Sequence, residues 1–293
     1  MVVRGQADRV TVRRILVTMT AQAHKAGRLL AFHHASEPLV LVNAWDAASA
    51  RIVESCGFPA LATTSAGVAN LEGFRDGHSI GCETMLAGVA RIARAASVPV
   101  TADMENGYGS TVEDAIATAR GVIAAGAVGL NFEDGISEGP APLLDIPTQV
   151  RRIRAIREAA QELGVPLVIN ARTDMYLKSV GDAGARLAAT LERARAYVAA
   201  GADCVFVPGV VDEATIGALV RGVDAPLNVL AGEKSPSLAQ LQRLGVRRVS
   251  FGSWPFGHAM FSLQRFAIAV RDNRESAIVA ERISHGDLNE LFG

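Results

Sequence analysis

The chain has 293 residues, of which 49% are hydrophobic and 20% are charged, a composition typical of a globular protein with ample core material. The formal net charge is −1, from 29 Lys and Arg against 30 Asp and Glu, so the charge balance gives no reason to expect nucleic acid or an anionic membrane as partner. No apolar run reaches the length of about 18 residues that predicts a membrane span. The three scattered cysteines do not form the even-numbered framework of a secreted disulfide protein, so we predict a cytoplasmic location.

The N-terminal segment differs in composition from the rest of the chain. Residues 1–18 contain four arginines and no sustained apolar run, so they lack the pattern of a secretory signal. We predict that they form a disordered leader. From Met19 to about residue 35, recurring Ala and Leu predict a helix, which Pro38 ends.

From residue 39 onward, short β-branched apolar runs alternate with longer amphipathic stretches rich in Ala and Arg. Eight strands are predicted, at 39–43, 60–65, 98–103, 129–133, 166–171, 203–208, 226–230 and 248–252. Helices are predicted between them, among them 113–125, 149–163, 184–200 and 237–244. Gly126, Gly201 and Gly245 each follow a predicted helix, where glycine supplies a left-handed C-cap.

The alternation of strands and helices predicts parallel strands joined by right-handed crossovers. Eight such units favour a (β/α)8 TIM-type barrel over residues 19–255. An open doubly wound sheet is the alternative, but its first strand would end in a Gly-x-Gly-x-x-Gly turn, and here Ala44-Trp45-Asp46 follows. The remaining residues, 256–293, are predicted to be a helical tail with an apolar side that either caps its own barrel or packs on a neighbouring subunit.

One predicted strand ends in two acids, Asp103 and Glu105, separated by a single residue. Residues i and i+2 of a strand point to the same side, so the two carboxylates can converge. Like charges this close are costly unless a cation lies between them, and oxygen ligands favour Mg²⁺ or Mn²⁺. The alternative is an ordinary polar turn after a strand. This stretch alone leaves both interpretations open.

Active sites of barrels lie at the carboxyl ends of the strands, so the polar residues at the other strand ends are candidates as well. These are Asn43, Trp45 and Asp46; Thr63, Thr64, Ser65, Ala66 and Gly67; Asn131, Glu133 and Asp134; Asn170, Arg172 and Asp174; and Asn228, with Glu233 and Lys234 beyond it. The small-residue turn at 63–67 offers backbone N–H groups that could cradle an anion. Arg172 could clamp a carboxylate with two hydrogen bonds or form a salt bridge to Asp174.

Together and in this order, the motifs resemble the phosphoenolpyruvate mutase/isocitrate lyase superfamily over about residues 36–255. The resemblance rests on Asn43-Ala44-Trp45-Asp46, Thr64-Ser65-Ala66-Gly67, Gly73-Phe74-Arg75-Asp76, the run from Ala102 to Gly109, Phe132-Glu133-Asp134 and Asn170-Ala171-Arg172-Thr173-Asp174. It implies a barrel enzyme that uses Mg²⁺ on a substrate that is, or becomes, an α-oxo acid. It also implies a homo-oligomer, a dimer of dimers in which the C-terminal helix packs on a neighbouring barrel.

The resemblance also implies a role for individual residues. Asp103 resembles the direct metal ligand, and Glu105 and Glu133 resemble acids that hold metal-bound waters. Ser65, Ala66 and Gly67 resemble the cradle for a carboxylate or enolate oxygen, and Arg172 resembles the clamp on the substrate carboxylate. Asp76 resembles a mobile acid near the reacting centre, so Asp76, Glu133 and Arg172 are the predicted catalytic residues. Trp45 and Asn228 are predicted to line the substrate site.

The sequence departs from the family at two places. Isocitrate-type lyases carry a Lys-x-Cys-Gly-His type segment on a lid, whereas residues 135–142 contain no Lys, Cys or His. The end of the sixth strand offers Val207-Pro208-Gly209 instead of a His or Glu. We therefore expect a carbon–carbon lyase acting on a small 2-oxo or 2-hydroxy (di)carboxylate through an enolate, of oxaloacetate decarboxylase or acyl-lyase type. The alternatives are a C–P bond enzyme of the phosphonopyruvate hydrolase or mutase type, and a non-catalytic protein that binds an oxo acid.

Overall fold

The strands form a closed parallel barrel. The structure, a computed structural model, describes residues 21–77, 80–136 and 141–293. Its strands are β1 (Leu39–Leu41), β2 (Asn43–Ala44), β3 (Leu61–Thr63), β4 (Val100–Asp103), β5 (Gly129–Glu133), β6 (Val168–Arg172), β7 (Cys204–Phe206), β8 (Leu227–Leu230) and β9 (Arg248–Ser250). Only Val42 separates β1, which pairs with β9, from β2, which pairs with β3, so the first predicted strand joins both edges of the sheet. The predicted (β/α)8 barrel is confirmed.

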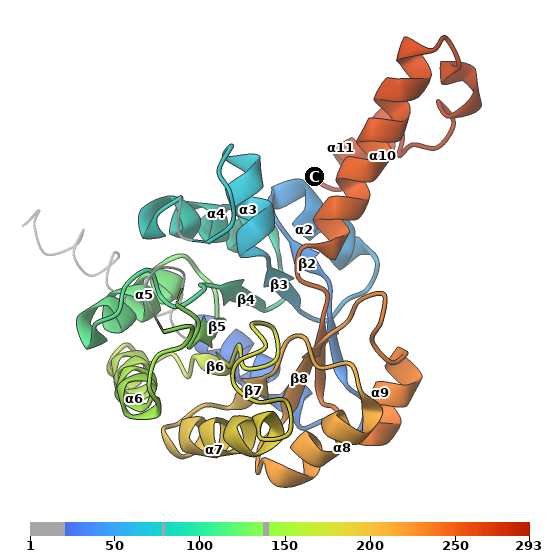
Figure 1. The fold of residues 1–293 in the computed structure, drawn as a ribbon. Helices are drawn as coiled ribbons and strands as arrows, with labels where there is room; N and C mark the ends of the chain where they lie inside the picture. The colour runs from blue at the N-terminus through green and yellow to red at the C-terminus, as the bar shows by residue number, and fades with distance from the viewer. Residues whose placement is uncertain (1–20, 78–79, 137–140) are drawn as a thin grey trace, which may run out of the picture.

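Helices surround the barrel, as Figure 1 shows. Those after residue 33 are α2 (Ala47–Ser55), α3 (Ser65–Leu71), α4 (Cys82–Ala95), α5 (Val112–Ala124), α6 (Ile146–Glu162), α7 (Arg186–Ala199), α8 (Glu213–Gly222), α9 (Leu238–Leu244), α10 (Trp254–Arg271), the 3₁₀ helix η1 (Glu275–Ala277) and α11 (His285–Glu290). Local sequence sets many of their ends. Asp46 and Ser49 form a capping box that starts α2, as Thr111 and Asp114 do for α5. The predicted left-handed glycine caps are confirmed, for example Gly245 with φ 91°.

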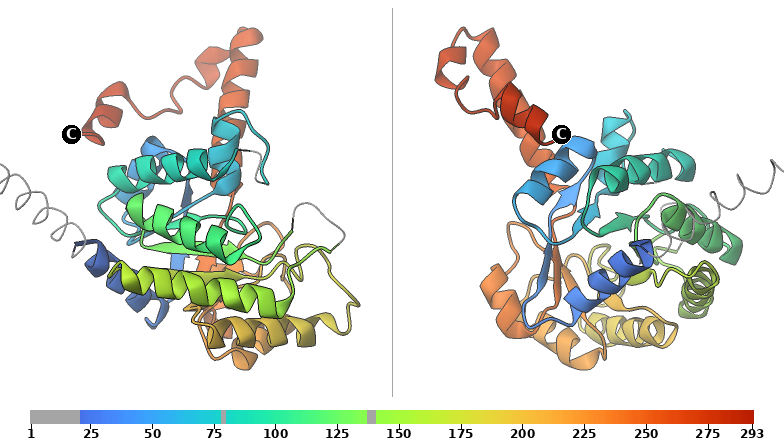
Figure 2. Two further views of the ribbon diagram at one scale, coloured as in Figure 1. Left: turned by 90° about the vertical axis from the view of Figure 1, so that its left-hand side faces the viewer. Right: turned by 180° about the vertical axis from the view of Figure 1, so that it is seen from behind.

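A further helix, residues 21–33, covers the N-terminal end of the barrel (Figure 2). The side-chain amide of Gln22 donates to the carbonyl oxygens of Ile123, at 2.8 Å, and Ala127, at 3.0 Å. At the other end of this helix, the buried ring of His33 contacts the side chain of Arg248 on β9. The helix therefore closes the end of the barrel opposite to the predicted site.

The two faces of the strands differ in chemistry. On β5, Leu130 and Phe132 belong to the apolar layer between the sheet and the helices. The alternate residues Asn131 and Glu133 point into the barrel, where they bond to side chains from other strands. The continuous apolar runs predicted for the strands therefore describe only the helix-facing layer, because the inner face carries polar residues.

The C-terminal residues form a projection that leaves the barrel (Figures 1 and 2). Helix α10 has no buried residues, and Leu263, Phe266 and Val270 on the predicted apolar side are 60%, 43% and 48% exposed. The tail therefore does not cap its own barrel, one of the two arrangements left open by the sequence. No helix in the described part of the chain is long and apolar enough to cross a membrane. The predicted leader, residues 1–18, lies outside the described residues.

Candidate active site at the C-terminal end of the barrel

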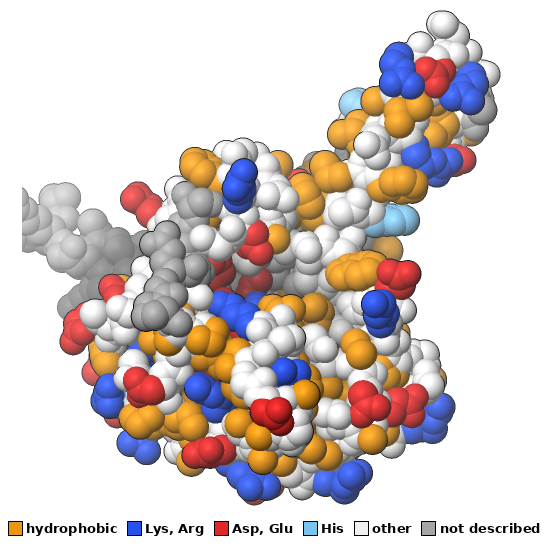
Figure 3. Space-filling view, in the orientation of Figure 1, with side chains coloured by type: hydrophobic (Ala, Val, Ile, Leu, Met, Phe, Trp, Pro, Cys, Tyr) orange, Lys and Arg blue, Asp and Glu red, His pale blue; other side chains and the backbone are white. Residues whose placement is uncertain are grey.

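Three neighbouring strands bring the predicted acids and Arg172 to one end of the barrel. Asp103 is the last residue of β4, Glu133 the last of β5 and Arg172 the last of β6. In the strand register Asp103 pairs with Asn131 and Glu133 pairs with Arg172, so these side chains face the same interior. In the space-filling view, acidic side chains lie in a hollow on this face, with hydrophobic side chains beside them (Figure 3). The strand ends thus converge as the sequence predicts.

Neutral donors hold the carboxylate of Asp103 within the described part of the chain. Its Oδ2 accepts hydrogen bonds from the hydroxyl of Ser65, at 2.8 Å, and from the Ser65 backbone N–H, at 3.2 Å. Its Oδ1 accepts from the side-chain amide of Asn131, at 3.2 Å. Its backbone N–H donates to Thr63 Oγ1 at 2.8 Å. Within the described residues, no Lys, Arg or His comes within ion-pair distance of Asp103, so its orientation is fixed but its charge is not neutralised by a direct partner.

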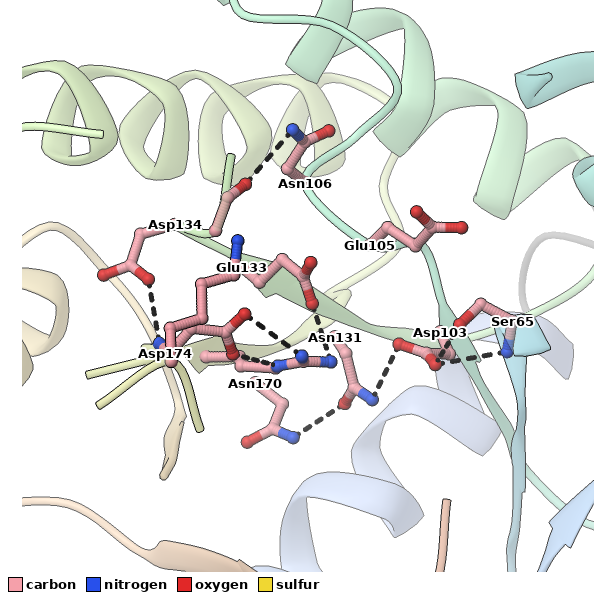
Figure 4. Close-up of polar contacts among 12 residues, drawn as sticks. Ser65, Asp103, Glu105, Asn106, Asn131, Glu133, Asp134, Asn170 and Asp174 are labelled. Carbon is pink, nitrogen blue, oxygen red and sulfur yellow. Dashed lines mark hydrogen bonds and ion pairs between the residues drawn. The ribbon is translucent and has the colours of Figure 1, made fainter. Parts of the chain in front are cut away.

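A buried polar chain supports Asp103 from inside the barrel (Figure 4). The side-chain oxygen of Asn131 accepts from Asn170, at 2.7 Å, and from Arg248 Nη2, at 3.1 Å. Two donors on this oxygen fix the Asn131 amide so that its NH₂ group points at Asp103. Arg248 in turn contacts His33 Nε2 at 3.4 Å. This chain connects the helix at the bottom of the barrel with the acid at its mouth.

Arg172 forms the salt bridge to Asp174 that the sequence left open, and a second one to Glu133. Its Nε and Nη2 donate to Asp174 at 2.7 and 3.2 Å, and its Nη1 lies 2.7 Å from Glu133 Oε2. Burial raises the pKa of Glu133 well above its usual value, and nearby acids add to this, although Arg172 opposes it. Burial alone would lower the pKa of Arg172, but Glu133 and Asp174 outweigh burial and raise it. These bonds use three of the five guanidinium N–H groups, so two remain for a substrate carboxylate.

Glu105 is positioned by a tight loop after β4. It is buried and has φ 49°, an uncommon left-handed conformation for a non-glycine residue. The hydroxyl of Tyr108 donates to Glu105 Oε1 at 3.0 Å. Burial and the charge of Glu105 raise the pKa of Tyr108, so the phenol stays protonated. Tyr108 is therefore a neutral donor at the site.

Arg152 of α6 binds the backbone of the same loop. Its guanidinium donates to the carbonyl oxygens of Asn106, at 2.5 Å, Gly109, at 2.7 Å, and Thr111, at 3.2 Å. Three carbonyls of the loop thus share one buried cation, which lies 4.6 Å from the centre of the Phe132 ring. Sequence reasoning missed this residue, because an arginine in an amphipathic helix gives no signal that it faces inward.

Asp76 and the Ser65–Gly67 turn lie beside Asp103. Burial and the charge of Asp103 raise the pKa of Asp76, whereas Arg172 and the Ser65 hydroxyl oppose the rise. The predicted cradle is the first turn of α3. Within it, the N–H of Ser65 donates to Asp103 and that of Gly67 donates to Thr64 Oγ1 at 3.3 Å. A substrate oxyanion would therefore compete with internal partners for two of these three N–H groups, and the cradle role stays a prediction.

Trp45 lies next to the α3 turn, whereas Asn228 lies inside the barrel. The Trp45 ring packs edge-on against Phe256 at 5.3 Å between centroids, next to the α3 turn. Asn228 is fully buried inside the barrel, where its oxygen accepts from Ser250 at 3.4 Å. Its side-chain nitrogen has no hydrogen-bond partner among the described residues. A buried donor without a partner is costly, so this atom requires a water or a ligand atom.

Comparison with known proteins identifies the family. A family profile described as phosphoenolpyruvate phosphomutase matches residues 29–271. The chain belongs to the phosphoenolpyruvate mutase/isocitrate lyase superfamily. An uncharacterized protein of Mycobacterium tuberculosis is 37% identical over 246 residues, which cover 83% of this chain and 88% of that one. An oxaloacetate decarboxylase of Rhodopseudomonas palustris is 29% identical over 292 residues, which cover 93% and 96%.

Solved structures of superfamily proteins have the same fold. A Burkholderia cenocepacia structure, provisionally described as a lyase/mutase, has a TM-score of 0.87 and 36% identity, with 94% of this chain and 97% of that one covered. A phosphonopyruvate hydrolase complex with oxalate and Mg²⁺ has a TM-score of 0.80 at 22% identity, covering 91% and 94%, which shows the fold alone. The superfamily comprises lyases and mutases that cleave C–C or C–P bonds. The prediction of an enzyme, a carbon–carbon lyase of this superfamily, is therefore confirmed at family level.

The donor set fits the Mg²⁺ that superfamily enzymes use. In the described parts of the chain, no three His, Cys, Asp or Glu side chains lie close enough to bind one metal ion directly. Mg²⁺ usually keeps several waters and takes only one or two carboxylates. Asp103, which has no direct cationic partner among the residues that the structure describes, suits a direct ligand, and Glu105 and Glu133 suit acids that bind metal-bound waters. These assignments stay predictions.

The segment that replaces the superfamily lid is anchored at both ends. Gly135 and Leu143 form an antiparallel bridge, and Ile136 N–H donates to the Pro142 carbonyl at 3.0 Å. The ammonium of Lys178 donates to the Ile136 carbonyl at 2.7 Å. Residues 137–140 lie outside the described residues. Sequence reasoning missed Lys178, which lies beyond the Asn170–Asp174 motif and belongs to no recognisable pattern.

Proposed function

We propose that this protein is a Mg²⁺-dependent lyase that cleaves a C–C bond of a small 2-oxo or 2-hydroxy (di)carboxylate through an enolate. The observation that carries the proposal is that Asp103 forms no direct ion pair with a Lys, Arg or His of the described residues. It ends a strand beside Glu105 and Glu133, and its hydrogen-bond partners in the described part of the chain are neutral donors, whereas Glu133 already has Arg172. Such a group of acids is stabilised by a bound divalent cation.

The residues around Asp103 supply what an enolate-forming reaction needs. When bound, Mg²⁺ would polarise the oxo group and stabilise negative charge that develops on its oxygen. The two remaining N–H groups of Arg172 would hold the substrate carboxylate, and the Ser65–Gly67 turn lies nearby to contact a second oxygen. Asp76, whose pKa is raised by burial and by Asp103, would move a proton at the reacting carbon.

Turnover with Mg²⁺ tests the proposal. We expect the purified protein to consume oxaloacetate, or a 2-methylmalate-type acid, only when Mg²⁺ is present. Asp103→Ala should lower kcat/KM at least about a hundredfold, as expected for the loss of a group that stabilises developing charge. The matched control is Asp224→Ala, because Asp224 is exposed and precedes β8 at the opposite end of the barrel. Its activity should equal that of the wild type.

Two other outcomes would replace the proposal. Release of phosphate from phosphonopyruvate, without turnover of any carbon acid, would make the protein a C–P bond enzyme. Calorimetry that shows Mg²⁺-dependent oxalate binding without turnover of any of these acids would make it an oxo-acid-binding protein.

A further inference from the structure

A second cavity lies on the same end of the barrel as the acids, on the opposite side of the strand ring. Its volume is about 280 Å³, close to the lower limit of about 300 Å³ for small-molecule sites. Its apolar lining comes from the loops after β6 and β7, from the end of β8 and from the start of α10, and includes Leu177, Val211, Leu230 and Trp254. Leu177, Val211 and Trp254 are 48%, 43% and 52% exposed. This apolar pocket has no role in the site described above.

Strand alternation places Leu230 of the apolar pocket on the same side of the sheet as Arg172. Arg172 and Asn228 each pair with Phe206 in the strand register, so all three side chains face the barrel interior. The Phe206 ring accordingly lies 5.8 Å from the Arg172 guanidinium. Leu230 follows Asn228 by two residues on β8, so it points to the same side, one step closer to the mouth. A ligand whose carboxylate is held by Arg172 can therefore extend toward Leu230.

The lining indicates what such an extension is made of. Besides its apolar residues, the apolar pocket contains one acid and one base, the consecutive Glu233 and Lys234, so its side chains carry no net charge. The loop after β7 contributes Gly209 and Val211 to the lining, and neither has a polar side chain. A second carboxylate would lose hydration there and would meet Glu233 as well as Lys234, whereas a hydrocarbon chain would be stabilised by leaving water.

We infer that the substrate carries a short alkyl substituent next to its oxo-acid group, and that Leu177, Val211, Leu230 and Trp254 bind this substituent. The inference rests on the proposed function, because it takes the oxo-acid group to be bound by Mg²⁺ and Arg172. It makes the apolar pocket a determinant of specificity among 2-oxo and 2-hydroxy acids.

Binding of N-alkyl oxamates tests the inference, because oxamate is a planar 2-oxo-acid analogue whose amide nitrogen occupies the position of the substituted carbon. Calorimetry on the full-length protein with Mg²⁺ would compare oxalate, oxamate, N-propyl oxamate and N-(2-carboxyethyl) oxamate. Each buried methylene should strengthen binding about fourfold. N-propyl oxamate should therefore bind at least about tenfold more tightly than oxamate, and the carboxyethyl compound should gain nothing.

Two variants test whether the apolar pocket causes the tighter binding of N-propyl oxamate, the propyl gain. Leu177→Asp and Val211→Asp lie on exposed loop positions, and each should abolish the propyl gain while leaving oxamate affinity unchanged. Leu238→Asp is the matched control, since Leu238 is 41% exposed but does not line the apolar pocket, and it should keep the gain. Three results would overturn the inference but not the proposed function. They are equal affinity for oxamate and N-propyl oxamate, tighter binding of the carboxyethyl compound than of oxamate, and a propyl gain that survives in both variants. Failure of oxalate and oxamate to bind with Mg²⁺ would overturn the proposed function as well.

Discussion

At the scale of single residues, the neighbours of a side chain decide its role more than its chemical type does. Asp103 ends one barrel strand and Asp134 directly follows another, but Asp134 is buried outside the barrel, where it accepts from Tyr197, at 2.7 Å, and from the backbone N–H of Asp174, at 3.0 Å. Asp134 therefore fixes the backbone beyond β6, whereas Asp103 faces the interior. Neighbouring residues of a strand point to opposite sides, so Asp134 faces away from the barrel interior although the preceding Glu133 faces into it.

His33 gives a test at this scale. Burial and the charge of Arg248 lower its pKa to about 3, and its Nδ1 must carry the proton because it donates to the Leu29 carbonyl at 2.8 Å. Between pH 6.5 and pH 3 the unfolded chain binds a proton at this position and the folded chain does not. Stability therefore falls as pH falls, by about 1.4 kcal/mol per pH unit from this residue, or about 2 kcal/mol from pH 6.5 to 5.0.

Chemical denaturation at pH 6.5 and 5.0 measures this contribution. His33→Gln should lose less stability over that interval than the wild type, by about 2 kcal/mol. His34→Gln, at the exposed neighbouring position, should keep the wild-type slope. Identical slopes for His33→Gln and the wild type would show that His33 is not held neutral.

At the scale of elements, the loop after β4 shows why the site requires particular backbone conformations. Gly107 has φ 87°, and a Cβ added there would come within 2.6 Å of the Phe132 ring. This loop carries Glu105 and is fixed by Arg152, so a shift of its backbone would move an acid that is predicted to hold metal-bound water. The glycine allows the strand end, the Phe132 ring and the bound loop to pack together.

Gly107→Ala tests this packing against a matched glycine. Gly57 has nearly the same φ, 86°, but no atom lies within 4 Å of its added Cβ. Both alanine variants should lose about 1–2 kcal/mol of unfolding free energy to the left-handed backbone conformation. Gly107→Ala should lose about 1–3 kcal/mol more through overpacking and should also weaken Mg²⁺ binding. Equal losses for the two variants in urea unfolding would contradict the assigned contact.

At the scale of the whole molecule, the protruding α10 indicates an assembly. Leu263, Phe266 and Val270 on this helix are 60%, 43% and 48% exposed, and a row of exposed apolar side chains marks an interaction surface. The homo-oligomer that the family resemblance implies would cover them. The oligomeric state and the cytoplasmic location stay predictions.

Sedimentation tests the assembly. The wild type should sediment as an oligomer, and Leu263→Glu should shift it toward monomer, because a charge would have to be buried in the interface. Gln264→Glu adds the same charge at the next position of α10, outside the predicted apolar side, and should leave the oligomer intact. A monomeric wild type would refute the assembly.

The sequence by itself determined the barrel, the order of its strands and the convergence of Asp103, Glu133 and Arg172, because strand periodicity and the carboxyl-end rule are local or topological. Only the tertiary structure decided which neighbours each acid has. The salt bridge of Arg172 to Glu133, the support of Asp103 through Asn131 and Arg248, and the anchoring of the Glu105 loop by Arg152 all join residues far apart in the chain. Such contacts depend on packing between elements, which no spacing in the sequence encodes.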